Sequence, residues 1–70
     1  MSMTVPGWHC QALEHGLVAQ RLVRLTDYQR LNGCLPEVTA ADEDELWILC
    51  DAQTRLAERV AVAETARKLP

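Results

Sequence analysis

The chain has 70 residues and a net charge of −3, and its length allows one small domain, which buries only about 60% of the surface of its unfolded chain. The charge is uneven, since residues 1–36 carry three basic and two acidic residues whereas residues 37–70 carry four and eight. An acidic half repels phosphate and attracts basic protein surfaces, which argues against nucleic acid as the main partner.

The first predicted element is a helix over residues 6–32. Proline is tolerated in a first helical turn, as at Pro6, and glycine readily forms a helix C-cap, as at Asn32-Gly33. We find no alternating strand pattern and no hairpin turn in this stretch. Seven residues recur instead at the three-four spacing of one helical face. These residues are Trp8, Gln11, His15, Val18, Leu22, Leu25 and Gln29.

A loop over residues 33–38 leads to a second predicted helix over residues 39–68. Thr39 and Asp42 form a capping-box pattern at its start, and the acidic run that follows suits the partial positive charge of a helix N-terminus. Apolar residues again recur at three-four spacing and predict a core stripe. The stripe is Leu46, Leu49, Gln53, Leu56, Val60 and Ala63, and Cys50 and Ala57 widen it.

Two helices joined by so short a loop fold back on each other, so the predicted fold is an all-α, antiparallel two-helix hairpin that forms a single domain over residues 1–70. Apolar residues are left outside the seam of the hairpin, which predicts a homodimer in the form of a four-helix bundle. The alternative is a monomer in which the long side chains of Arg21 and Arg24 cover the second stripe. The residues predicted for the dimer interface are Leu17, Tyr28, Leu31 and Val62.

Trp47 is the most informative side chain for function. Its neighbours on a helical wheel are polar and mostly acidic, and an aromatic anchor surrounded by charge is typical of a binding hot spot. The alternatives are that Trp47 packs in the dimer interface or is exposed without a role. The residues predicted to bind a partner are Trp47, Ile48, Asp42, Glu43, Asp44, Glu45 and Asp51.

The leading hypothesis is a non-enzymatic adaptor or inhibitor that occludes a basic surface of another protein. That protein could be a nucleic-acid-binding regulator, blocked by an anti-activator of phage or plasmid type. A second hypothesis is a structural or secretion-chaperone subunit whose apolar stripe shields a partner helix. A third is a transcriptional regulator that binds DNA through Arg21, Arg24 and Arg30, although Asp27 lies among them and no helix-turn-helix spacing is present.

Site chemistry is sparse in this sequence. No catalytic residue or cofactor is predicted, because no nucleophile, base and orienting group stand at a plausible spacing. His9, Cys10 and His15 match none of the usual zinc spacings, so no metal site is predicted. Three cysteines without paired spacing favour free thiols. The start of the chain lacks a signal-peptide pattern and the longest apolar run, LWILC, is too short to span a membrane, so the predicted localisation is cytoplasmic.

Overall fold

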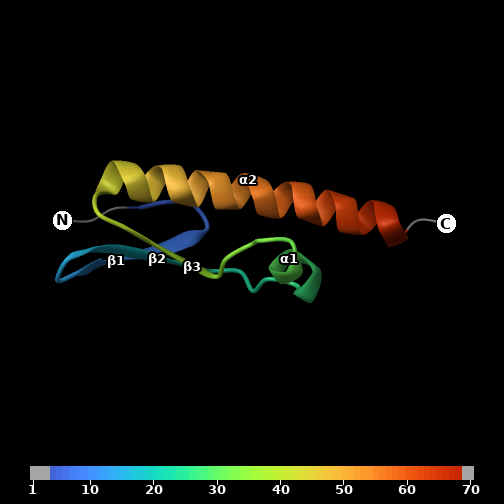
Figure 1. The fold of residues 1–70 in the computed structure, drawn as a ribbon, viewed down its shortest axis with the longest axis horizontal. Helices are drawn as coiled ribbons and strands as arrows, with labels where there is room; N and C mark the ends of the chain where they lie inside the picture. Colours follow the sequence, from blue (N-terminus) through green and yellow to red (C-terminus); the bar gives the residue numbers. More distant parts are fainter. Residues whose placement is uncertain (1–3, 69–70) are drawn as a thin grey trace.

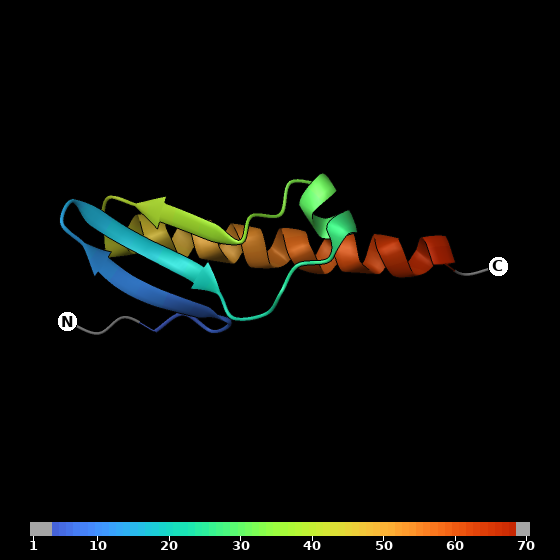
Figure 2. The ribbon, with the colours of Figure 1, turned by 90° about the horizontal axis from the view of Figure 1, so that it is seen from below.

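The computed structural model describes residues 4–68. In chain order the elements are β1 (Trp8–Leu13), β2 (Gly16–Arg21), α1 (Asp27–Leu31), β3 (Glu37–Ala40) and α2 (Glu43–Lys68). The three strands form one antiparallel sheet in the order β1-β2-β3, and the long helix α2 runs along the sheet and continues well past it (Figures 1 and 2). The short helix α1 lies beside the part of α2 that extends beyond the sheet (Figure 1).

The predicted all-α hairpin is wrong, because residues 6–32 form two strands and one short helix. The predicted helical face would have placed Gln11 and His15 in an apolar seam, where a polar side chain without a partner costs free energy. A strand pair avoids this cost because successive side chains point to opposite faces of the sheet. Cys10 lies opposite Ala19 and packs against the core under α2, whereas Gln11 is exposed.

A two-residue turn, Glu14-His15, joins β1 to β2 and places Leu13 opposite Gly16. The backbone of Gly16 has a φ of 129°, which residues with a Cβ atom rarely adopt. A Cβ atom at this position would stand 2.6 Å from the carbonyl oxygen of Ala40 in β3. Glycine is therefore needed here both for the turn and for the close approach of the neighbouring strand.

The first core cluster lies between the sheet and the N-terminal half of α2. Leu46 and Cys50 on α2 and Ala19 on β2 have no exposed surface. The small side chain of Ala19 allows α2 to approach the central strand closely. The other members are Val5, Trp8, Val38 and Ala40, with Cys10, Leu17 and Leu49 partly buried against them.

A second core cluster lies where α1 meets the C-terminal half of α2. It is formed by Leu25, Cys34, Ala57 and Val60, with Tyr28 and Leu56 partly buried against it. The chain thus has two small cores along one helix instead of one seam between two helices.

Helix α1 is held by caps at both ends, because its five residues are too few for a stable isolated helix. At its start the Thr26 hydroxyl accepts the Gln29 N–H, and the Gln29 side chain accepts the Thr26 N–H. At its end Gly33 has a φ of 89°, and the Cys34 N–H donates to the Gln29 carbonyl. The predicted helix end at Asn32-Gly33 is confirmed, although it closes a short helix and not a long one.

The second predicted helix is present, but α2 begins at Glu43, and Thr39 lies in β3. Its N-terminus is capped by Asp42, whose carboxylate accepts the Glu45 N–H at 2.8 Å. Three acids in the first turn and two bases in the last turn suit the dipole of the helix. The acidic run is therefore in part helix-start chemistry, as predicted.

The buried thiol of Cys50 makes the stability of the core depend on pH. Burial raises its pKa from 9.0 to about 11, and the nearby Cys10 acts in the same direction. Between pH 9 and about pH 11, the Cys50 thiol loses its proton in the unfolded chain and keeps it in the folded chain. The contribution of this group to stability is therefore complete below pH 9 and is lost as the pH rises through about 11.

We expect the free energy of unfolding of the wild-type chain to fall more steeply in this alkaline range than that of a Cys50→Ala variant. The expected difference is about 2 kcal/mol by the upper end of the range, since one pKa unit corresponds to about 1.4 kcal/mol. Urea denaturation at a series of pH values measures it. Parallel pH profiles for the two proteins would show that Cys50 ionises equally in the folded and unfolded chains.

Candidate protein-binding surface

The outer face of α2 brings together four of the predicted partner-binding residues. Asp44, Trp47, Ile48 and Asp51 follow the spacing i, i+3, i+4, i+7, so they share one face of the helix. All four are exposed, Trp47 at 45% and Ile48 at 68%. We call these four residues the Trp47 patch.

The local packing explains why this patch stays at the surface. Leu46 and Cys50 occupy the side of α2 that faces the sheet, and both are fully buried. Trp47 and Ile48 follow Leu46 directly, so the helix turns them away from that core. Complete burial of such a side chain gives about 1.5–3 kcal/mol. Trp47 and Ile48 are 45% and 68% exposed, so much of this free energy is not realised within the chain.

The patch is acidic, and one of its charges is partly compensated. The Arg55 Nε atom lies 3.0 Å from the Asp51 carboxylate, one helical turn away, and both side chains are exposed. Exposed pairs of this kind contribute only about 0.3–0.5 kcal/mol. Asp44 belongs to the run of acids in the first turn of α2, so negative charge lies beside the apolar pair.

The other three acids predicted for partner binding lie outside the Trp47 patch. The carboxylate of Asp42 caps α2, and Glu43 is half-buried. Glu45 lines a shallow hollow beside the β1–β2 turn, together with His15 and Leu17. The predicted acidic surface is therefore divided between the end of α2 and its outer face.

The four residues predicted for a dimer interface do not form the predicted stripe. Leu17 in β2 packs against the first core and Tyr28 in α1 against the second, and both are half-buried. Leu31 in α1 is 84% exposed and Val62 in α2 is 69% exposed. The predicted stripe requires one continuous helix over residues 6–32, whereas the structure has two strands and one short helix there. This also removes the apolar stripe on which the chaperone hypothesis was based.

The arginines considered for DNA binding do not share a helix. Arg21 ends β2, Arg24 follows that strand, and Arg30 lies in α1. Arg21 makes its contacts within the chain, with Trp8, Leu35 and Gln53. The surface expected for the DNA-binding hypothesis is therefore not assembled in this fold.

A polar cluster around Arg21 was not predicted from the sequence. The Arg21 guanidinium stacks 4.6 Å from the centre of the Trp8 ring and donates to the Leu35 carbonyl at 2.6 Å. It also donates to the main-chain and side-chain oxygens of Gln53 at 3.0 and 3.1 Å. The Trp8 indole N–H donates to the Thr54 hydroxyl at 3.0 Å. Burial lowers the pKa of Arg21 below its usual value, yet the group stays charged at neutral pH.

An open depression of about 310 Å³ lies beside this cluster, bordered by Trp8, Arg21, Val23 and Glu58. Gln53 also accepts the Leu35 N–H at 2.8 Å through its side-chain oxygen. These bonds tie the end of β2, the segment before β3 and the middle of α2 together. The cluster therefore holds these three segments in place.

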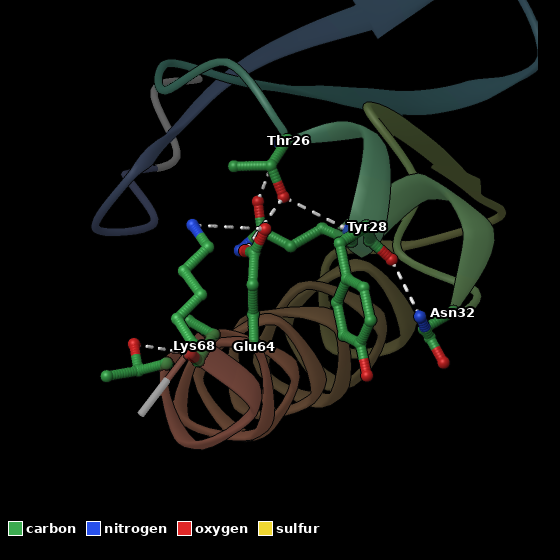
Figure 3. A network of polar contacts seen from close by, with 8 residues as sticks. Thr26, Tyr28, Asn32, Glu64 and Lys68 are labelled. Atoms are coloured by element: carbon green, nitrogen blue, oxygen red, sulfur yellow. Dashed lines mark hydrogen bonds and ion pairs between the residues drawn. The ribbon is translucent and has the colours of Figure 1, made fainter. Parts of the chain in front are cut away.

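A second polar network fixes the end of α2 to α1 (Figure 3). The Thr26 hydroxyl donates to the Glu64 carboxylate at 3.3 Å, and the Lys68 Nζ atom lies 3.8 Å from the same carboxylate group. The Arg67 guanidinium lies 5.1 Å from the centre of the Tyr28 ring. These contacts use one side of the last turns of α2 and leave its outer side uncovered.

Within residues 4–68, no group of three His, Cys, Asp or Glu side chains is placed to hold a metal ion. His9 and Cys10 are neighbours in β1 and alternate between the two faces of the sheet, while His15 lies in the exposed turn. Cys10, Cys34 and Cys50 are free thiols. In the same part of the chain, neither helix has the length and apolar character needed to cross a membrane.

Comparison with known proteins gives no indication of function, so the proposal below is based on the surface of the molecule. No family model, curated protein or solved structure matches the chain. The structure defines a small α/β domain, a three-stranded antiparallel sheet followed by one long helix, whose outer helical face carries the Trp47 patch.

Proposed function

We propose that the chain is a non-enzymatic protein-binding module whose Trp47 patch docks on a basic surface of another protein. The observation that supports this most directly is the exposure of Trp47 and Ile48 side by side on α2, between Asp44 and Asp51. Large apolar side chains framed by charge are typical of binding hot spots.

The proposed mechanism is occlusion of the partner surface in the cytoplasm, with no covalent chemistry. The two acidic residues of the patch raise the rate of encounter with a basic surface, and Trp47 and Ile48 slow dissociation. An adaptor or inhibitor of this kind would block a nucleic-acid-binding regulator by occupying its basic site.

The test compares capture of host proteins by immobilised wild-type chain, by Trp47→Ala and by an Asp44→Asn, Asp51→Asn double variant. We expect Trp47→Ala to weaken capture of the partner by roughly 30-fold or more, the effect of losing a hot-spot residue. The double variant is expected to bind more slowly and with a weaker dependence on salt. Mass spectrometry identifies the captured protein, and its binding site is expected to be basic.

Leu31→Ala is the matched control for these variants. Leu31 is an exposed apolar residue like Trp47, at 84%, but it lies on α1. Its replacement is expected to leave capture unchanged. Equal capture by the wild type, Trp47→Ala and the neutralised variant would remove the proposal.

A further inference from the structure

We infer that, without a partner, the Trp47 patch is covered by the outer face of α2 from a second copy of the chain, with the two helices antiparallel. This inference rests on the proposed function, because it names what occupies the same patch when the partner is absent. Three observations support it: the positions of Trp47 and of a shallow hollow along α2, the opposite charges at the two ends of this helix, and the exposed apolar surface of its outer face.

The register places a bulky side chain and a matching hollow on one helical face. Trp47 and Thr65 are separated by 18 residues, which is five turns of about 3.6 residues, so they lie on the same side of α2 roughly 27 Å apart. Thr65 lines a shallow apolar hollow together with Ala61, Val62 and Ala66. When two antiparallel helices set Trp47 opposite Thr65, a two-fold axis seats both tryptophans at once.

The same register matches charge along the pair. It brings the acidic first turn of one α2 beside the basic last turn of the other, where Arg67 and Lys68 keep their contacts with Tyr28 and Glu64 and act through their charge alone. The dipoles of antiparallel helices add to this attraction. Near the centre, the register brings Glu58 of one copy close to Arg55 of the other, and both residues are exposed. A parallel pair would instead set the acidic turns against each other.

The long side of the molecule sets an upper limit on the contact. The molecule measures 49 × 16 × 16 Å, so this side has an outline of roughly 800 Å², which equals the share of each partner in a standard interface and of which α2 supplies a part. Ile48 and Val62 contribute apolar surface at 68% and 69% exposure.

The consequence is a module that conceals its own binding site. In the dimer each Trp47 is covered, so a partner protein must displace the second copy before it binds. Capture of the partner then increases with the fraction of monomer, and a variant that fails to dimerise but keeps Trp47 binds the partner at lower concentration.

The test is sedimentation equilibrium of the wild type, Ala61→Arg and Trp47→Ala across a wide range of concentration. The wild type is expected to have twice the mass of one chain. Ala61→Arg fills the hollow, and both variants are expected to raise the dissociation constant of the dimer by roughly 30-fold or more. Far-UV circular dichroism confirms that each variant is folded, which is expected because both positions are exposed.

Disulfide trapping checks the direction of the helices, in a Cys10→Ala background. The register sets position 51 opposite position 61, so a mixture of Asp51→Cys and Ala61→Cys chains is expected to form a mixed disulfide under oxidation. Asp51→Cys chains alone are the matched control and are expected to cross-link poorly, because antiparallel pairing separates the two copies of position 51 by roughly 15 Å. Efficient cross-linking of Asp51→Cys alone overturns the antiparallel arrangement.

The outcomes separate this inference from the proposed function. A wild type that stays monomeric while Trp47→Ala loses the host partner overturns the inference and leaves the proposed function standing. A dimer broken by both variants, with an Ala61→Arg monomer that captures no basic partner, supports the inference and removes the proposed function. A dimer that survives both substitutions uses another surface and overturns the inference.

Discussion

Replacing Trp8 by alanine is expected to remove about 3–5 kcal/mol of stability, the usual cost of truncating a large aromatic residue in a core. Trp8 is only 5% exposed and belongs to the first core cluster. Its ring is also covered by the Arg21 guanidinium, and its indole N–H bonds to Thr54. Proteins have roughly 0.05–0.15 kcal/mol of stability per residue, so this loss approaches the whole margin of so short a chain.

Trp47→Ala is the matched control, because it removes the same side chain from a surface position of 45% exposure. It is expected to change the free energy of unfolding by no more than about 0.5 kcal/mol, measured where the chain is monomeric. Urea unfolding followed by far-UV circular dichroism suits both variants, since each loses a tryptophan that fluorescence would report. Similar destabilisation by the two substitutions would contradict a buried Trp8 and an exposed Trp47.

The second helix could be predicted because its signals are local. Strong helix formers, an acidic start and a basic end extend over the whole of α2. Leu46, Cys50, Ala57 and Val60 from the predicted stripe and its widening are buried, whereas Ala63 is exposed. A stripe of this kind shows which side of a helix is covered, but it does not show whether a helix or a sheet covers it.

The first half of the chain could not be resolved by spacing alone. Trp8 and Val18 fit a three-four repeat, while Trp8 and Cys10 fit the alternation of a strand equally well. The deciding contacts are distant in sequence: Cys10 lies opposite Ala19, and α2 covers both. The local signal that was missed is Gly16, which follows the two-residue turn and has the positive φ that favours glycine next to a hairpin turn.

The parts of the candidate site also differ in whether they could be predicted from the sequence. The Trp47 patch depends only on positions along α2, so it could be predicted although the fold predicted for the first half of the chain was wrong. The dimer stripe depended on a first helix and was lost with it. The cluster around Arg21 requires the register that places Arg21 opposite Trp8, and that register follows only once the hairpin is known.

Gly16→Ala is expected to destabilise the chain by about 2–4 kcal/mol, because two independent costs meet at this position. The φ of 129° strains a residue with a Cβ atom, and the added carbon would stand 2.6 Å from the Ala40 carbonyl oxygen. A left-handed backbone costs about 1–2 kcal/mol, and overpacking costs about 1–3 kcal/mol. The oxygen belongs to the main chain of β3, so it cannot move aside as a flexible side chain would.

Two other glycines separate these costs. Gly7 has a φ of 84° with open space where a Cβ atom would lie, and Gly33 has a φ of 89° with the nearest atom, on Leu56, at 3.8 Å. Alanine at either position is expected to add only the backbone cost of about 1–2 kcal/mol. Urea denaturation of the three variants gives the comparison, and the excess loss in Gly16→Ala measures how tightly β3 closes on the hairpin. If Gly16→Ala were no worse than Gly7→Ala, β3 would have room at that end of the sheet, and the close approach that positions Ala40 against α2 would be refuted.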